Sequence, residues 1–191
     1  SKGSPEEIKL ASHGFRGTIA QTLADPAATH LEDSDNIILK HHGSYQQDDR
    51  DLRAQLAKEK KDKAWSFMVR SKMPGGRVTA AQWLMHDDMC TKSNGTLRLT
   101  TRQGIQLHGV LKGNLKELIG AVNRSGLTTM GACGDVVRNV MYCPAPKAGP
   151  LHQQILADAR NLSDRLLPGN CSVIGVHPVH HDLRHRDLRI V

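Results

Sequence analysis

Residues 95–110, GTLRLTTRQGIQLHGV, contain two runs in which apolar and polar side chains alternate. A period of two is typical of a β-strand, because successive side chains point to opposite faces of the sheet. The two runs meet at Gln103-Gly104, a pair that favours a tight bend. The sequence therefore predicts two short strands joined as a hairpin.

The predicted hairpin gathers polar side chains on one surface. Its apolar side would hold Leu97, Leu99, Thr101, Ile105, Leu107 and Gly109. The opposite side would hold Arg98, Thr100, Arg102, Gln106, His108 and Val110. Arginine is planar, permanently charged and rich in donors, which suits it to carboxylates and other oxyanions. The pattern fits either a polyanionic partner or the solvated face of a half-buried sheet.

The flanking residues predict an α+β unit around the hairpin. We expect a strand over 66–73, ended by Pro74, and a helix over 79–90 that Thr79 caps. In this helix Trp83 and Leu84 would lie on an apolar stripe. A second helix over 114–126 would be capped by Asn114 and bury Leu115, Leu118, Ile119 and Val122. The order β-α-β-β-α over 66–126 is most of a ferredoxin-like unit.

Outside this unit the signals are weaker. The N-terminal part predicts a helix over 15–24, a short strand at 37–39 and then a polar turn, HHGSYQQDD. Residues 50–64 are polar and charged, as in an exposed helix or a linker. Residues 150–167 predict an amphipathic helix that begins at Pro150.

The composition is basic and poor in aromatic residues. The 191 residues carry a net charge of +7, and aromatics make up 3%, so the core must rely on Leu, Ile, Val and Met. Residues 168–191 hold three arginines and two aspartates, so the rest of the chain keeps a charge of +6. A basic body can attract an anionic small molecule, an acidic protein or, nonspecifically, nucleic acid.

The cysteines and histidines give no ligand motif. Cys90, Cys133, Cys143 and Cys171 form no CxxC pair, which argues against a disulfide scaffold and favours a reducing compartment. His181 and His185 have metal-ligand spacing, but without flanking carboxylates or a folded context the pattern favours a disordered histidine-rich tail over a metal site. No apolar run reaches the roughly 18 residues that a membrane span requires, so we expect no membrane partner.

Several ordered blocks resemble one family. These blocks are FRGTIAQTL, HHGSYQQDDRDLR, FMVRSKMPGGRV, GTLRLTTRQGIQLHGVLKGNLKELI and GACGDVVRNVMYCPAP. Together they resemble the N-terminal portion of the assimilatory sulfite reductases, in the siroheme/4Fe-4S nitrite/sulfite reductase family. The resemblance covers roughly residues 5–167, and the remainder does not share it. A truncated gene product, a frameshift or a splice product would each have this form.

The resemblance implies a division of the chain. Residues 1–64 would form an N-terminal arm and linker that runs extended over the main body, and 65–130 a ferredoxin-like half-domain. Residues 131–167 would begin the siroheme/4Fe-4S domain, and 168–191 would be a divergent, disordered tail. The second ferredoxin-like half would lie beyond this chain.

The resemblance also implies a site. Arg98, Thr100, Arg102, Gln106 and His108 match residues that contact siroheme, and Arg70 and Arg138 match two that contact the substrate anion. The implied activity is six-electron reduction of sulfite to sulfide at siroheme coupled to a 4Fe-4S cluster. The electron donor would be ferredoxin or a flavoprotein reductase, and a ferredoxin–nitrite reductase is the alternative.

Residue by residue, other readings stay open. In the family, the cysteines that hold the 4Fe-4S cluster come as two close pairs, and the spacing of Cys133 and Cys143 does not match this pattern. We therefore assign no metal ligand and do not expect this chain alone to catalyse the reaction. Arg138 could instead pair with Asp135, and Tyr45, Gln46 and Gln47 could either contact the cofactor or dock the arm. The implied location is a soluble reducing compartment, the chloroplast stroma in a photosynthetic eukaryote and the cytoplasm otherwise.

Overall fold

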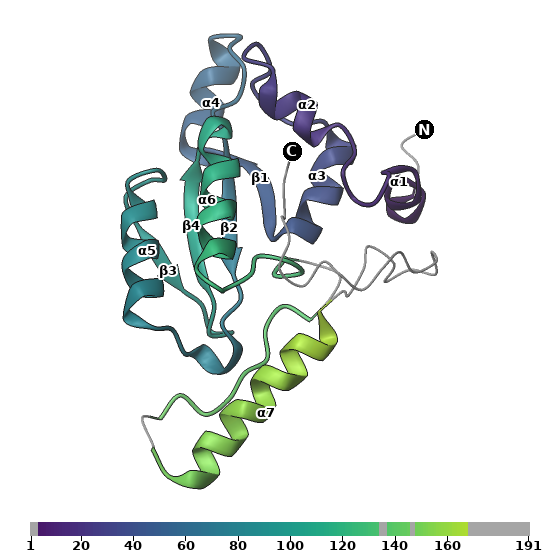
Figure 1. The fold of residues 1–191 in the computed structure, drawn as a ribbon. Helices are drawn as coiled ribbons and strands as arrows, with labels where there is room; N and C mark the ends of the chain where they lie inside the picture. The colour runs from purple at the N-terminus through teal and green to yellow at the C-terminus, as the bar shows by residue number, and fades with distance from the viewer. Residues whose placement is uncertain (1–3, 134–136, 146–147, 168–191) are drawn as a thin grey trace.

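A computed structural model describes residues 4–133, 137–145 and 148–167 of the chain (Figure 1). At its centre is a four-stranded antiparallel sheet with the strand order β1-β2-β4-β3. The strands are β1 (Ser44–Asp48), β2 (Trp65–Ser71), β3 (Leu97–Leu99) and β4 (Ile105–Val110). The predicted hairpin is therefore confirmed, with β3 and β4 as its two strands.

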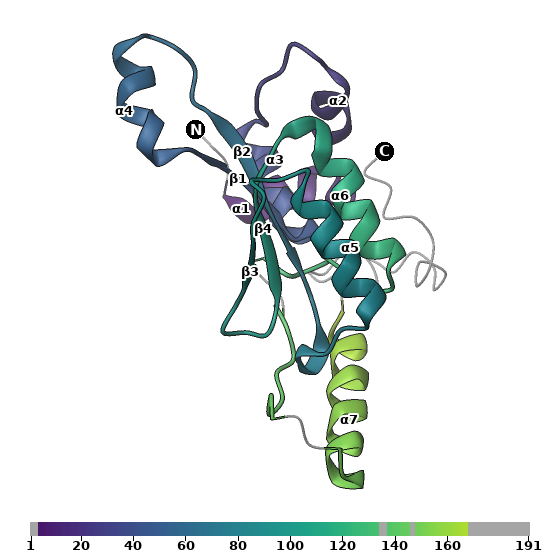
Figure 2. The ribbon, with the colours of Figure 1, turned by 90° about the vertical axis from the view of Figure 1, so that its left-hand side faces the viewer.

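Two helices cover one side of this sheet. Figure 2 shows α5 (Ala80–Cys90) and α6 (Lys112–Arg124) lying together on that side. The order β2-α5-β3-β4-α6 confirms the predicted α+β unit. Thr79 caps α5 as expected, since its Oγ1 accepts from the backbone N–H of Gln82 at 3.2 Å. The Gln82 side chain accepts from the backbone N–H of Thr79 at 2.9 Å and completes a capping box.

Two details of these helices were predicted wrongly. Trp83 and Leu84 are 41% and 63% exposed, and the buried residues of α5 are His86 and Met89. His86 is buried because Ser71 and the carbonyl of Gln82 satisfy both of its ring nitrogens. Helix α6 begins at Lys112, before Asn114, whose side chain instead donates to the carbonyl of Lys92. The predicted apolar face of α6 is confirmed: Leu115, Leu118, Ile119 and Val122 are all buried.

The N-terminal arm is largely helical. It contains α1 (Pro5–Ala11), α2 (Ile19–Ala24), α3 (Asp33–Leu39) and a short 3₁₀ turn, η1 (Lys40–His42). The strand expected at 37–39 is wrong because these residues end α3; a short apolar run fits a buried helix or a buried strand equally well. The predicted helix over 15–24 forms only in its second half, since Phe15 and Gly17 have positive φ.

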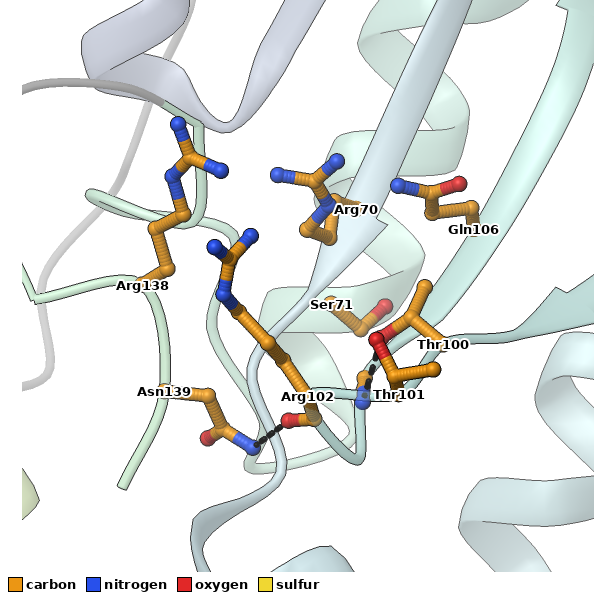
Figure 3. A pocket seen from close by; sticks show the side chains of 9 residues that line it. Arg70, Ser71, Thr100, Thr101, Arg102, Gln106, Arg138 and Asn139 are labelled. Atoms are coloured by element: carbon orange, nitrogen blue, oxygen red, sulfur yellow. Dashed lines mark hydrogen bonds between the residues drawn. The ribbon is translucent and has the colours of Figure 1, made fainter. Parts of the chain in front are cut away.

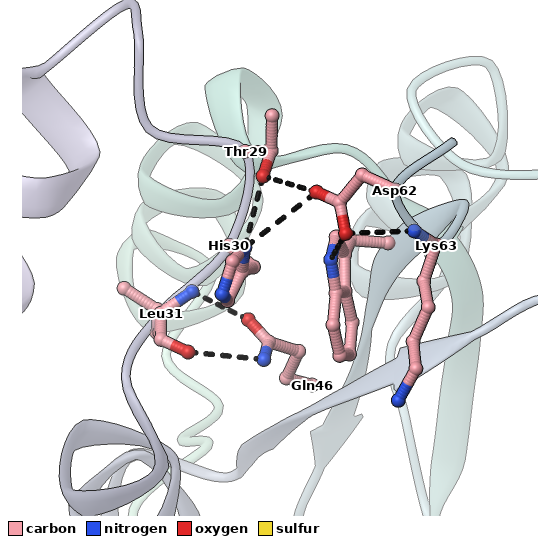
Figure 4. Close-up of polar contacts among 7 residues, drawn as sticks. Thr29, His30, Leu31, Gln46, Asp62 and Lys63 are labelled. Atoms are coloured by element: carbon pink, nitrogen blue, oxygen red, sulfur yellow. Dashed lines mark hydrogen bonds and ion pairs between the residues drawn. The ribbon is translucent and has the colours of Figure 1, made fainter. Parts of the chain in front are cut away.

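The polar turn expected after the arm is also wrong. Its residues Ser44–Asp48 form β1, which pairs with β2 along its whole length. The N-terminal helices and loops are fixed to this strand and to the segment before β2 by polar contacts (Figure 4). Gln46 accepts from the backbone N–H of Leu31 at 2.6 Å and donates to its carbonyl at 3.1 Å, while Thr29 donates to Asp62 at 2.7 Å. Gln46 therefore docks the arm.

One hydrophobic core joins the arm to the α+β unit. Phe15, Ile19 and Leu39 from the arm share it with apolar residues of the sheet and of α6. The arm thus has no separate core and is packed onto the main body. Among the partly buried residues around this core are Leu97 and Met85.

The remaining elements lie outside the core. Helix α4 (Arg50–Lys58) is exposed, as the sequence predicts, and η2 (Pro74–Gly76) follows β2. Helix α7 (Pro150–Leu166) projects from the body and packs on η2 (Figure 1). Gly75 has φ +69°, a conformation that favours glycine, and a Cβ there would lie 2.6 Å from Cδ1 of Leu156. No helix within the described ranges is both long and apolar enough to cross a membrane.

A β-bulge divides β4 into two parts. Gly109 has φ +69°, and the register between β2 and β4 shifts between Phe67 and Val69. Val110 was expected on the same side as His108, but the bulge turns it into the core, where it is fully buried. The predicted alternation is therefore correct within β3 and from Ile105 to His108, but not at residues 100–102, which lie in the turn outside both strands.

Candidate anion-binding site

A row of polar residues crosses three strands on the sheet face opposite the buried core residues. Gln106 on β4 is in register with Arg98 on β3 and with Arg70 on β2. Residues paired in register project to the same face, whereas the adjacent Val69, Ile105 and Leu107 point into the interior. The fold therefore brings together an arginine predicted for the substrate and two residues predicted for the cofactor.

Next to this row lies a cavity of about 150 Å³ (Figure 3). Its lining consists of Arg70, Ser71, Thr100, Thr101, Arg102, Gly104, Gln106, Arg138 and Asn139. The guanidinium groups of Arg70, Arg102 and Arg138 extend toward the same space (Figure 3). Among the residues that the structure describes, none that lines the cavity carries a carboxylate. Three permanent cations around one small cavity form a site suited to a small oxyanion.

The hairpin turn places Arg102 at the rim of this cavity. Thr100 and Gly104 close the turn, with the backbone N–H of Thr100 donating to the carbonyl of Gly104 at 2.9 Å. The Thr100 Oγ1 accepts from the N–H of Gly104 at 3.1 Å. Gln103 between them has φ +57°, so the chain reverses sharply directly after Arg102.

The other two arginines come from β2 and from the segment after residue 136. Arg70 lies near the end of β2, and its Nη1 donates to the carbonyl of Ala132 at 2.8 Å. Arg138 lies in an irregular segment that hydrogen bonds fix to β2 and to the hairpin turn. Asp135, the alternative partner suggested for Arg138, lies outside the described residues.

His108 extends the polar row away from the cavity. Its Nε2 is 3.2 Å from Oε1 of Gln106, and its Nδ1 is 3.4 Å from Nε2 of Gln47. Because the amide oxygen accepts and the amide nitrogen donates, these contacts fit a neutral ring protonated on Nε2. Burial and then the nearby Arg98 and Arg70 lower the pKa of His108 from its ordinary value, which favours the same neutral form. His108 and Arg98 are not among the residues lining the cavity.

Four lining residues were not predicted: Ser71, Thr101, Gly104 and Asn139. Ser71 is buried, and its hydroxyl is 2.8 Å from Nε2 of His86. Nothing in the sequence marks these residues, because Ser71 and Asn139 acquire their role only when β2 and a segment some 65 residues further on meet. Gly104 was recognised only as a turn residue.

The cysteines lie apart from any ligand set. Cys90, Cys133 and Cys143 are free thiols, and burial raises the pKa of Cys133 despite the neighbouring Arg70 and Arg138. Across 4–133, 137–145 and 148–167, no three His, Cys, Asp or Glu side chains are grouped to hold a metal ion. Cys171, His181, His185 and the predicted tail lie outside those ranges.

Fold and cavity together define a ferredoxin-like α+β half-domain that carries a cationic pocket beside its hairpin. Residues 58–125 match the sequence model of the nitrite/sulfite reductase ferredoxin-like half domain. Sulfite reductase hemoproteins that are 49% and 50% identical to this chain over 164 residues agree with this match. The chain therefore belongs to the nitrite and sulfite reductase family, as its motifs predict, and corresponds to the N-terminal portion of that family.

The chain is 49% identical over 164 residues to the NADPH sulfite reductase hemoprotein beta-component of Geobacillus thermodenitrificans. It is 50% identical over the same length to that of Staphylococcus haemolyticus. Each match covers 85% of this chain and 29% of the relative, so the chain spans less than a third of these proteins. The structure of the NirA protein of Mycobacterium tuberculosis shares the fold, with a TM-score of 0.70 at 23% identity, over 88% of this chain and 33% of NirA.

Proposed function

We propose that this chain provides a cationic binding surface of a sulfite reductase, an oxidoreductase of sulfate assimilation. The observation that carries the proposal is the convergence of Arg70, Arg102 and Arg138 on one small cavity, with no carboxylate lining it in the described part of the chain. Arg70 and Arg138 would bind sulfite, and Arg102 would lie between sulfite and the cofactor. The close relatives named as sulfite reductase hemoproteins support this assignment.

The residues present fit siroheme, a polycarboxylate macrocycle. The cavity of about 150 Å³ is large enough for a small oxyanion, and the macrocycle would lie across the polar row beside it. Arg98, Thr100, Arg102, Gln106 and His108 would hold its carboxylates through charge and hydrogen bonds. When bound, siroheme supplies the redox chemistry of sulfite reduction. The described residues offer no ligand set for a 4Fe-4S cluster, and we assign this chain no part in holding one.

The chain's own groups would act by neutralising and orienting the anion. A guanidinium can donate two parallel hydrogen bonds to one oxyanion, each charge-assisted. Three such groups fixed before the anion arrives need little reorganisation when charge develops on its oxygens. His108, held neutral, would donate or accept a hydrogen bond without adding a fourth positive charge.

We also propose the division of the chain given by its motifs. Residues 1–64 would be the arm and linker, 65–130 the half-domain, and 131–167 the start of the cofactor domain. The electron donor is proposed as the NADPH-linked flavoprotein reductase, because the relatives reported above carry NADPH in their names. Nitrite is the second candidate substrate, since the matching family includes nitrite reductases. The comparisons give nucleic acid no support, and we do not propose it.

Titration of the 191-residue chain tests the proposal. Sodium sulfite and an octacarboxylate porphyrin are added separately, and binding is followed by calorimetry and absorbance. We expect Arg98→Ala with Arg102→Ala to abolish porphyrin binding, and Arg70→Ala or Arg138→Ala to weaken sulfite binding by at least about tenfold. Arg165→Ala, which removes an exposed arginine of α7, is the matched control.

The cysteines provide the second control. Cys133→Ser and Cys143→Ser should leave both titrations unchanged. If the cysteine variants lose binding and the arginine variants retain it, the site is placed wrongly.

A further inference from the structure

We infer that Asn139 is a positioning residue which, together with Gln103 and Lys72, holds Arg138 at the anion pocket. The inference rests on the proposed function, since it concerns how one arginine of that pocket is fixed. Residues 137–142 have no regular secondary structure, so helix or strand hydrogen bonds do not hold Arg138 in place. Side chains and single backbone contacts must do so instead.

Asn139 joins two separate stretches of backbone through three carbonyl oxygens. Its Nδ2 lies 3.0 Å from the carbonyl oxygen of Met73, 2.8 Å from that of Arg102 and 3.2 Å from that of Gln103. A carbonyl oxygen can only accept, so these contacts require the nitrogen of the amide at this position. The neighbour of Arg138 is thereby tied to Met73, just after β2, and to the hairpin turn that carries Arg102. Figure 3 shows the bond to Arg102.

Gln103 makes a second connection further along the segment. Its Oε1 accepts from the backbone N–H of Tyr142 at 3.1 Å, and its Nε2 donates to the carbonyl of Tyr142 at 2.5 Å. The side-chain amide thus pairs with Tyr142 as a neighbouring strand would. Beside it, the backbone N–H of Gly75 donates to the carbonyl of Val140 at 2.9 Å.

Lys72 fixes the residue on the other side of Arg138. Its Nζ donates to the carbonyl of Val137 at 2.7 Å, and the whole residue is 1% exposed. Val137, Asn139, Val140 and Tyr142 are therefore all anchored, and the Arg138 side chain extends from a backbone that is held on both sides. We call Lys72, Gln103 and Asn139 the clamp.

The clamp would act on anion binding through preorganisation. A guanidinium whose backbone is already fixed loses less conformational freedom when it binds an anion. The same contacts set the place of Arg138 relative to Arg102, because Asn139 bonds to the carbonyl of Arg102 itself. If the clamp works this way, its contribution to affinity depends on Arg138 being present.

A double-mutant cycle on the 191-residue chain tests this dependence, with sodium sulfite as the ligand. We expect Asn139→Ala to weaken sulfite binding about fivefold in the natural background and to change it by less than about twofold when Arg138 is already alanine. Asn139→Leu, which removes the amide donors, keeps a similar size and adds no charge to the cavity, should behave like Asn139→Ala. Asn123→Ala is the matched control, since its amide also donates to a backbone carbonyl but does not line the cavity.

A second measurement needs no ligand. The order parameter of the Arg138 Nε–H bond, obtained by NMR relaxation on the anion-free chain, should fall in Asn139→Ala and in Gln103→Met and remain unchanged in Asn123→Ala. If Asn139→Ala reduced sulfite affinity equally with Arg138 present and with Arg138 replaced by alanine, Asn139 would act on the general structure and not through Arg138. An unchanged Arg138 order parameter in Asn139→Ala would also overturn the inference. Absence of sulfite binding by the natural chain, with the order parameter falling as expected, would overturn the proposed function and leave the clamp standing.

Discussion

The two faces of the central sheet are built from alternate residues of the same strands and differ in nearly every property. On the helix-covered face Val69 and Leu107 are 2% exposed and pack with α6. On the polar face their neighbours Arg70 and Gln106 are half-buried and lie beside the anion pocket. Alternate side chains of one strand can therefore do two jobs: one set stabilises the fold, and the other set is placed to bind a ligand.

The two faces also differ in the sign of their contribution to stability. Fully burying one large apolar side chain contributes about 1.5–3 kcal/mol, so the covered face stabilises the fold. Arginines that share a cavity repel each other until an anion lies between them. We therefore expect the polar face to cost stability in the absence of ligand and to return it on binding. Mutations on the two faces should have separate effects.

The largest effect on stability should come from the covered face. Leu118 of α6 is fully buried in the core. Leu118→Ala should lower the free energy of unfolding by about 2–5 kcal/mol, because it removes apolar contacts and leaves a cavity. Urea denaturation measures this loss. Sulfite affinity under native conditions should stay within about twofold, and a loss of affinity as large as that of Arg138→Ala would show that the faces are not separate.

A smaller loss of stability is expected at the β-bulge of β4, which determines the sheet face to which the residues after it point. Gly109 has φ +69°, and a Cβ there would lie 2.8 Å from Cβ of Asn94. Gly109→Ala should cost about 1–3 kcal/mol, since a left-handed backbone is strained for alanine and the contact is too close. Urea denaturation also measures this change. A neutral effect would mean that the bulge is not needed to bury Val110.

The effect of pH should be smaller still over any one unit. Burial lowers the pKa of Lys72 from its ordinary 10.5 to about 8, against the opposing influence of Asp164. Between these values the unfolded chain binds more protons than the folded chain, so the free energy of unfolding rises with pH from about 8 toward 10.5. The rise should be absent in Lys72→Met. Urea denaturation at pH 7.5, 8.5 and 9.5 measures the rise. If the free energy of unfolding changed equally with pH in the natural chain and in Lys72→Met, Lys72 would not be the group responsible.

Much of this arrangement could be predicted from the sequence, because local pattern decides it. The hairpin, the apolar face of α6 and the Thr79 cap all follow from periodicity or from a single residue at a helix start. The polar strand β1 was missed because its Gln-rich sequence has no apolar alternation, and its pairing with β2 is a tertiary property. Val110 was misplaced because one bulge reverses the face of everything after it.

In the site, too, residues that belong to a sequence motif could be predicted, and residues that act only through long-range contacts could not. Arg70 and Arg138 came from resemblance to family motifs, and the fold brings both to one cavity. Asn139 and Lys72 could not be predicted, since their partners lie 36 to 66 residues away along the chain. Residues that hold a binding group in place leave no local pattern when the contact spans such distances.

The proposed role of Arg70, Arg102 and Arg138 is to bind a small oxyanion together. Sulfite-dependent stabilisation of the 191-residue chain in urea is the sharpest test, because a ligand that binds only the folded state raises the unfolding midpoint. We expect sulfite to raise the midpoint of the natural chain and of Leu118→Ala alike, and Arg70→Ala, Arg102→Ala and Arg138→Ala each to lose most of this rise. Matched sodium chloride additions control for ionic strength. An equal rise in the arginine variants and in the natural chain would show that these arginines do not form the anion site.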